Sequence, residues 1–284
     1  MGYYLAIDEG TSSTRTLLFD GNFNLIDLSQ KEINMIYPRP GWVEQDAEEL
    51  YLKTEETMIE VVEKNNISWK DIIGIGITNQ RETVVAWDKN TGKPLYNAIV
   101  WQCRRTDEDI LPEIVGTAIE EGFETKFGPR IYGMIGDQQS ALFGQRAFEI
   151  GDAKCTYGTG AFVLMNSGTT PPKPHPGLLT SIGWKIGDEV IYSLEGSIFT
   201  VGAFFKWLKD IKIINDYNEL EAYSRGVDNA GVFIVPALSG LGTPYWDSDA
   251  RGLIIGLTRA TKKENIIRAA LESVAFSVRD VIDS

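Results

Sequence analysis

Two glycine- and threonine-rich turns, each between strand-like runs, constrain the fold of this chain more than any other feature. The first turn, Asp8–Arg15, separates the apolar run 4–7 from the run 16–19, and the second turn, Tyr157–Gly160, precedes the apolar run 161–165. Glycine lets a backbone turn tightly and approach a ligand closely, and hydroxyls and amides in such turns hold phosphate oxygens. The pair predicts two hairpins that grip one nucleotide, as in a phosphotransferase.

Length and charge narrow the class further. The chain has 284 residues, enough for one large domain or two ordinary ones. Its net charge of -13 argues against binding to nucleic acid, because phosphate backbones need a basic face. It contains no apolar stretch long enough to span a bilayer and no N-terminal signal pattern, so we expect no membrane insertion. An acidic enzyme still handles phosphate when local donors and a metal ion offset the ligand's charge.

The two cysteines and the single histidine give little scope for metal or histidine chemistry. Cys103 and Cys155 form no CxxC pattern, and a reduced, cytoplasmic setting fits them best, although two cysteines allow one disulfide. His175 lies in a proline-rich loop, so we do not expect histidine-dependent catalysis.

Strand, hairpin and helix units occur twice along the chain. In the first half we expect strands at 3–8, 15–20, 24–29, 72–77, 84–87 and 98–101 and a helix from Asp46 to about Lys64. In the second half we expect a strand at 130–135, a helix at 140–148, the second hairpin and a loop, helices near 197–211 and 217–225, a strand at 231–236 and a helix from Lys263. This repetition predicts an α/β protein with two related domains.

Polar and aromatic residues that follow apolar strands are the candidates for acceptor binding. Arg81 and Glu82 come just after the fully apolar run 72–77, and ligands of open α/β sheets bind beyond such strand ends. Arg81 donates hydrogen bonds and Glu82 accepts them, so the pair suits a compact neutral polyol; the alternative is a solvated salt bridge. Trp101 would cover a small substrate, or pack in the core. Phe162, beside the second turn, leaves the same two interpretations open.

Asp137 is the strongest candidate for a catalytic residue. It follows an apolar strand and Gly136, with the neutral hydrogen-bonding residue Gln138 beside it. A carboxylate there can take the proton from an attacking hydroxyl while magnesium and backbone donors stabilise the transferring phosphoryl group. The alternative is that Asp137 caps a helix starting at Ser140, and one residue can do both.

The first turn offers a separate set of phosphate and metal contacts. Asp8 can hold a magnesium ion through water, while Thr11, Ser12 and Arg15 contact nucleotide phosphates. The alternative is a polar hairpin loop without a ligand.

Taken together, several motifs resemble one known family. The stretches IDEGTSSTR, YPRPGWVEQD, GITNQRET, TGKPLYNAIVWQCRRT, IGDQQSALFGQ, TYGTGAFVLMNSG and GLGTPYWDSDARGLIIGLTRAT are similar to those of glycerol kinases, within the carbohydrate kinases of the actin-like and Hsp70-like ATPase fold. NQRET, WQCRR and GDQQ distinguish glycerol kinases from their xylulose and gluconate relatives. The resemblance implies two ribonuclease H-like (actin-like ATPase) domains with a cleft between them, 1–146 on the glycerol side and 147–284 on the nucleotide side.

The resemblance also implies a role for each candidate residue. Asp137 would be the general base, ATP the phosphoryl donor, and Mg²⁺ would be held by Asp8 and Asp137. The residues implied around glycerol are Arg81, Glu82, Trp101, Asp137, Gln138 and Phe162. Those implied to face ATP are Thr11, Ser12, Arg15, Gly158, Thr159 and Gly202. A cytoplasmic kinase, with a homo-oligomer (dimer or tetramer) left open, would follow.

The chain departs from the family pattern at several points. Family members usually have Gln where Glu9 and Lys206 stand. After Thr106 relatives insert a stretch on the order of a hundred residues, and beyond the position of Ser284 they continue through a glycine-rich segment that holds adenine. We expect a chain that lacks both stretches not to turn over glycerol. The alternatives to a glycerol kinase are a kinase for another small polyol or sugar and a non-catalytic relative that binds nucleotide or glycerol.

Overall fold

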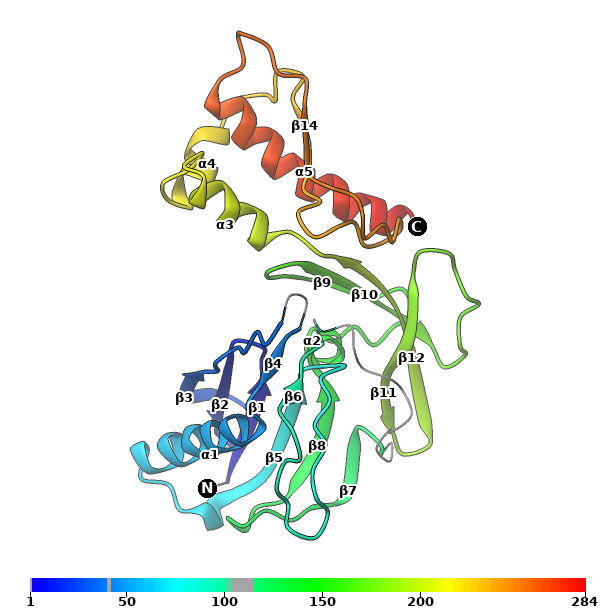
Figure 1. The fold of residues 1–284 in the computed structure, drawn as a ribbon. Helices are drawn as coiled ribbons and strands as arrows, with labels where there is room; N and C mark the ends of the chain where they lie inside the picture. The colour runs from blue at the N-terminus through cyan, green and yellow to red at the C-terminus, as the bar shows by residue number, and fades with distance from the viewer. Residues whose placement is uncertain (1, 40–41, 102, 104–114) are drawn as a thin grey trace. The chain divides into compact units, whose positions relative to one another are not determined.

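The computed structural model describes residues 2–39, 42–101, 103 and 115–284, which form two compact units (Figure 1). Unit 1 comprises Met1–Ser140 and Trp184–Glu189, and unit 2 comprises Ala141–Gly183 and Val190–Ser284. Both units combine helices with sheets, as an α/β protein should. The predicted functional division into domains 1–146 and 147–284 stays a prediction.

A six-stranded sheet forms the centre of unit 1, in the order β3-β2-β1-β5-β8-β7. Its strands are β1 (Tyr3–Glu9), β2 (Ser13–Phe19), β3 (Leu25–Glu32), β5 (Ile72–Asn79), β7 (Ala118–Phe123) and β8 (Ile131–Gly136). The strands β1, β5 and β8 run parallel, whereas β2, β3 and β7 are antiparallel to their neighbours. The carboxyl ends of the three parallel strands therefore meet at one edge of the sheet.

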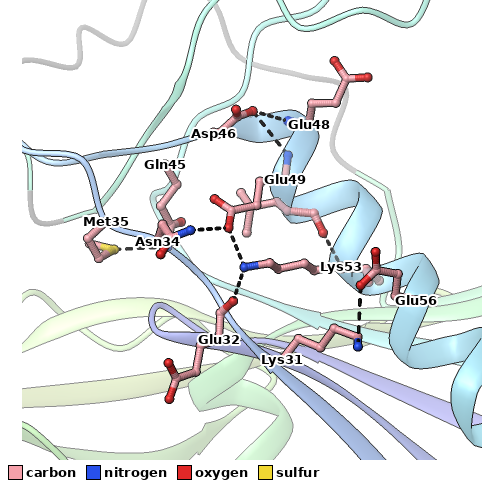
Figure 2. Close-up of polar contacts among 12 residues, drawn as sticks. Lys31, Glu32, Asn34, Met35, Gln45, Asp46, Glu48, Glu49, Lys53 and Glu56 are labelled. Atoms are coloured by element: carbon pink, nitrogen blue, oxygen red, sulfur yellow. Dashed lines mark hydrogen bonds and ion pairs between the residues drawn. The ribbon is translucent and has the colours of Figure 1, made fainter.

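Helix α1 (Ala47–Lys64) covers this sheet and completes the core of unit 1. The side chain of Asp46 caps the helix by accepting hydrogen bonds from the backbone N–H groups of Glu48 and Glu49 (Figure 2). The apolar face of α1 packs on the strands, because buried apolar side chains recur at helical spacing on one side of it. The buried cluster consists of Leu5, Ile7, Leu18, Met58, Val61, Val62, Ile72 and Ile75.

Shorter elements of unit 1 differ in part from the sequence expectations. Strand β4 (Glu44–Gln45) pairs with β6 (Ala98–Ile99), and a 3₁₀ turn spans Trp69–Asp71. The strand predicted at 84–87 forms only isolated bridges, Val84 with Ile99 and Trp87 with Pro94.

Helix α2 (Asp137–Gly144) follows β8 directly, so the helix predicted at 140–148 begins and ends earlier than expected. Asp137 is thus the first helical residue rather than a cap outside the helix. The helix does not reach Phe148, because Arg146 adopts a left-handed backbone with φ 61 that a helix cannot continue through.

Most of a four-stranded antiparallel sheet, in the order β11-β12-β10-β9, lies in unit 2 with helices beside it, and only the Trp184–Glu189 end of its β11–β12 hairpin is counted with unit 1. The strands are β9 (Ala153–Tyr157), β10 (Ala161–Gly168), β11 (Leu179–Ile186) and β12 (Glu189–Ile198). The helices are α3 (Gly202–Asp210), α4 (Asn218–Ser224) and α5 (Lys263–Asp283), and β13 (Phe233–Val235) pairs with β14 (Leu253–Ile255). Apolar side chains of α5, including Val274 and Val281, pack with Ala161 and Ile198 of the sheet.

The sequence expectation missed the β11–β12 hairpin, which occupies part of a predicted loop. Its two-residue connection is Gly187-Asp188, and Gly187 has φ 58, which is a turn that glycine permits. Because β12 continues to Ile198, the helix predicted from about 197 begins only at Gly202.

Two further findings concern the cysteines and membrane insertion. Cys103 and Cys155 are both free. Within the described ranges, every helix is too short or too polar to cross a bilayer.

Asp27 on β3 contacts the C-terminal end of α1, and its lowered pKa leads to a prediction about stability in acid. Hydrogen bonds from Lys64, Asn65 and the amide of Leu28 lower its pKa to about 2. A lowered pKa of this kind contributes stability above the unfolded value, and the contribution is lost as the pH falls toward the folded value. Asp27→Asn should therefore lower the free energy of unfolding at neutral pH, and the difference from the parent should shrink toward pH 2.

Urea unfolding of parent and variant across this pH range measures the effect. Asp188→Asn, in the exposed β11–β12 connection, is the charge-matched control. Parent and Asp27→Asn curves that coincide at neutral pH would contradict the assignment.

Candidate functional site

The first turn connects β1 to β2 and is held by backbone and side-chain contacts. The amide of Gly10 donates to the carbonyl of Ser13 at 3.0 Å. Asp8 and Arg15 are partners in the strand register, and Arg15 Nε lies 2.7 Å from Asp8 Oδ2. The ion pair places a carboxylate and a guanidinium side by side at the carboxyl end of β1, where a phosphate or a cation can meet both.

Glu9 fastens the base of this turn to helix α1. Its carboxylate accepts hydrogen bonds from Thr14 Oγ1 at 2.8 Å and from Thr54 Oγ1. Burial raises the pKa of Glu9, while the two threonine hydroxyls oppose that shift. A glutamine side chain has the same shape and an oxygen to accept these bonds, so the anchor does not require a carboxylate at this position.

Arg81, Asp137 and Gln138 come together at the ends of β5 and β8. Arg81 Nε lies 3.3 Å from Asp137 Oδ1, and Gln138 Nε2 donates to Asp137 Oδ2 at 3.0 Å. Both carboxylate oxygens of Asp137 are therefore oriented. A Cβ atom on Gly136 would lie 2.9 Å from Cγ and Cδ of Arg81, so any other residue would force the stem of Arg81 to shift.

The two remaining acceptor candidates of unit 1 also lie near the strand ends. Glu82 has a left-handed backbone with φ 64, a strained conformation for a residue other than glycine that is often found at functional sites. Trp101 is 42% exposed, which excludes the core interpretation, and its indole Nε1 donates to Thr11 Oγ1 at 2.9 Å. The sequence did not reveal this contact between an acceptor candidate and a phosphate candidate. Ser12 belongs to the same turn, where its carbonyl accepts from the amide of Ile33.

The carboxylates of Asp8 and Asp137 suit a magnesium ion that is bound mainly through water and phosphate. Magnesium needs only one or two carboxylates when substrate phosphates and waters complete its octahedron. Asp8 pairs with Thr78 in the register between β1 and β5, and the Oγ1 atom of Thr78 is buried without a hydrogen-bond partner. Among the described residues there is no group of three or more His, Cys, Asp or Glu side chains that could hold a metal by itself.

The second turn lies in unit 2 and is held by the N-terminus of α3. The amide of Gly202 donates to the carbonyl of Gly158 at 2.9 Å, and the amides of Val201 and Ala203 donate to the carbonyl of Thr159 at 2.9 and 3.1 Å. A Cβ atom on Gly202 would lie 2.5 Å from the carbonyl oxygen of Gly158. The three nucleotide candidates of this unit, Gly158, Thr159 and Gly202, are therefore in direct contact.

Phe162 and Lys206 are the other two residues of unit 2 that the sequence analysis singled out. Phe162 is half-buried on β10, opposite Thr156 and Ser197, and its carbonyl accepts from Lys154 Nζ at 3.3 Å. Lys206 points to solvent and pairs with Asp210, one helical turn further along α3, at 2.7 Å. The predicted site residues thus form one group in unit 1 and another in unit 2.

Two buried glutamines, which the sequence expectations did not include, hold the first turn. Gln45 is 0% and Gln80 is 8% exposed, and their amide groups donate to the carbonyls of Thr11 and Gly10. The only sequence signal was their position within the motifs YPRPGWVEQD and GITNQRET.

Comparison with known proteins gives a consistent result over both halves. The N-terminal domain of the FGGY family of carbohydrate kinases matches residues 3–136, and its C-terminal domain matches residues 153–284. The chain is 39% identical to the glycerol kinase of Clostridium perfringens (strain 13), covering 99% of this chain and 78% of the relative. It is also 39% identical to glycerol kinase 2 of Thermotoga maritima, covering 100% of this chain and 79% of the relative.

Solved structures agree with these sequence matches. The crystal structure of Plasmodium falciparum glycerol kinase with ADP superposes with a TM-score of 0.88 at 30% identity, covering 100% of this chain and 78% of that one. The ligand-bound xylulose kinase of Lactobacillus acidophilus superposes with a TM-score of 0.85 at 16% identity, which shows the fold alone. The predicted family resemblance and α/β fold are confirmed.

Relatives contain sequence that has no counterpart here. The match to the Clostridium enzyme extends over 391 positions, of which this chain of 284 residues can fill only part. The position predicted for the gap, after about residue 106, lies among residues 104–114, outside the described residues, and stays a prediction.

The close approach of Gly202 to the second turn leads to a stability prediction. Gly202→Ala should destabilise the protein by about 1–3 kcal/mol, because the added methyl group must displace a backbone carbonyl. Gly144→Ala is the matched control, since a Cβ there meets nothing within 4 Å and its backbone is not left-handed. Thermal unfolding measures both variants. Equal melting temperatures for the two would show that the turn does not depend on this contact.

Proposed function

The chain belongs to the FGGY family of carbohydrate kinases, and we propose that the natural polypeptide, with any stretch that its relatives carry and this sequence lacks, transfers the γ-phosphoryl group of ATP to a terminal hydroxyl of glycerol. The observation that carries the proposal is the Asp137 carboxylate, held on one oxygen by Arg81 and on the other by Gln138. Similarity supports the choice of acceptor, because the glycerol kinases compared are 30–39% identical whereas the xylulose kinase is 16% identical.

In the proposed reaction Asp137 acts as the general base. It accepts the proton of the attacking glycerol hydroxyl as the new O–P bond forms and the bond between the γ-phosphorus and the β–γ bridging oxygen breaks, releasing ADP. Arg81 and Gln138 orient the carboxylate, and ion pairing to Arg81 limits its freedom to turn away from the acceptor. Together with Glu82 and Trp101, these residues bind glycerol, and Phe162 contributes from unit 2.

The two turns hold the phosphates of ATP in this proposal. Thr11, Ser12 and Arg15 contact them from the first turn, because hydroxyls and a guanidinium donate hydrogen bonds to phosphate oxygens. From unit 2 the contacts are Gly158, Thr159 and Gly202. Asp8 and Asp137 would hold Mg²⁺, which supplies positive charge to neutralise the phosphate oxygens.

Asp137→Asn should reduce ATP-dependent formation of glycerol 3-phosphate by roughly a thousandfold or more, since an amide cannot accept the proton. Glycerol affinity should change little, because the amide keeps an oxygen to accept hydrogen bonds. A coupled assay measures transfer by the natural polypeptide, and calorimetry measures glycerol binding. Loss of glycerol binding in the variant, with no transfer by the parent, would instead favour a non-catalytic binding protein.

A panel of polyols and sugars tests the proposed acceptor. We expect kcat/KM for glycerol to exceed that for xylulose and gluconate by a factor on the order of a hundred or more, because a site built for hydroxyl contacts discriminates by hydrogen bonding. A clearly higher kcat/KM for a sugar would contradict glycerol as the acceptor and indicate another kinase activity of the family. Whether the protein forms a dimer or tetramer stays a prediction that the mass of the native assembly would test.

A further inference from the structure

We propose that Gln45 and Gln80 are positioning residues that lock the first turn to the acceptor-binding segment through a closed ring of hydrogen bonds. The inference rests on the proposed function, since it assigns these side chains to the coupling of nucleotide and acceptor sites. Neither glutamine touches glycerol or ATP in that proposal. Each acts through the backbone and side chains that do.

Gln80 joins the segment that carries Arg81 to the first turn. Its Nε2 donates to the carbonyl of Gly10 and to Oε1 of Gln45, both at 3.0 Å. A carbonyl oxygen only accepts, so the contact with Gly10 fixes which end of the amide carries the N–H groups. Gln80 is therefore held in one orientation.

Gln45, on β4, completes the support of the turn. Its Nε2 donates to the carbonyl of Thr11 at 2.5 Å and faces the sulfur of Met35 at 3.2 Å. Figure 2 shows Gln45 beside Met35. Gln45 directly precedes Asp46, the cap of α1, so the start of the helix fixes the backbone of Gln45. Two successive carbonyls of the turn, those of Gly10 and Thr11, are thus each bound by a buried amide.

The ring closes through two residues of the acceptor side. Thr83 Oγ1 donates to Gln80 Oε1 at 3.2 Å and accepts from the backbone N–H of Trp101 at 3.2 Å. The indole of Trp101 returns to Thr11 Oγ1 at 2.9 Å. Thr11, Gln45, Gln80, Thr83 and Trp101 therefore form one continuous circuit.

The directions of the hydrogen bonds determine how the ring couples the binding of the two ligands. Thr11 accepts from the indole, so its own O–H is left to donate to a phosphate oxygen. In the proposed complex glycerol contacts Trp101 and a phosphate contacts Thr11, so one ligand touches the donor and the other touches the acceptor of the same hydrogen bond. Because the side chains of Gln45 and Gln80 in the same ring are buried, breaking their hydrogen bonds costs free energy, so one ligand stabilises the arrangement that the other requires. The expected result is tighter glycerol binding when nucleotide is present, with the reciprocal effect of equal size.

Thr83 offers the most direct test, because it is partly exposed and its replacement need not disturb the core. Thr83→Val keeps the shape and removes the hydroxyl, whereas Thr83→Ser keeps the hydroxyl. Calorimetry measures glycerol affinity with and without the β,γ-imido analogue of ATP and Mg²⁺. We expect the ratio of the two affinities to fall at least about threefold toward unity in Thr83→Val and to be retained in Thr83→Ser, with the affinity for the analogue alone unchanged.

The results of this experiment distinguish failure of the ring's proposed role from failure of the proposed function. A purely structural role of Thr83 would weaken both ligands alike and leave the ratio unchanged, which would overturn the inference. An equal ratio in the valine and serine variants would do the same. A parent that binds neither ligand would overturn the proposed function and the ring's role together.

Gln80→Glu tests the ring at its centre. The glutamate keeps the volume and still accepts from Thr83, but when ionised it cannot donate to Gly10 or Gln45. We expect kcat/KM for the natural enzyme to fall roughly tenfold to a hundredfold, while Gln145→Glu, an exposed site with the same charge change, remains at the parental value. Gln80→Met, neutral and of similar size, repeats the test if the glutamate variant fails to fold. Parental kcat/KM in a folded Gln80 variant would refute the assignment.

Discussion

The parallel pairing of β1, β5 and β8 is the constraint on which the rest of unit 1 depends. In this register Asp8 lies opposite Thr78, and Asn79 lies opposite Gly136, so three strands end at the same level. Each strand end continues into a functional segment: the first turn, the Arg81 segment and helix α2. A slip of one residue in any pair would reverse the face of every side chain beyond it. The buried apolar cluster under α1 opposes such a slip.

The sequence predicted the elements of this arrangement better than their contacts. Apolar runs and turn residues predicted β1, β2, β5 and α1, because hydrophobic periodicity is a local signal. They did not predict the β11–β12 hairpin, although Gly187-Asp188 is a hairpin turn, because proline and glycine in the preceding segment favoured a loop. The short helix α2 was placed three residues late, since nothing local shows that a strand passes directly into a helix at Asp137.

The candidate site shows the same limit. Asp137 and Arg81 were predicted from their positions after apolar strands, but their ion pair depends on Gly136, whose missing side chain makes room for the stem of Arg81. Gln45 lies far from Gln80 in sequence, and the motifs that contain the two residues do not indicate that they are partners. The hydrogen bond between them joins β4 to the end of β5, which belong to different sheets, and periodicity does not reveal such a tertiary contact. The residues that support a site are therefore harder to predict than those that touch its ligands.

In both turns two successive backbone carbonyls accept hydrogen bonds from the protein, but the donors differ. In the first turn, buried glutamine side chains bind the carbonyls of Gly10 and Thr11. In the second, backbone amides of α3 bind those of Gly158 and Thr159. A carbonyl oxygen would repel a phosphate, so engaging both carbonyls elsewhere favours hydroxyl and amide donors toward the anion. The first turn consequently depends on side-chain chemistry and the second on the absence of a side chain at Gly202, so the two halves of the proposed site should tolerate different substitutions.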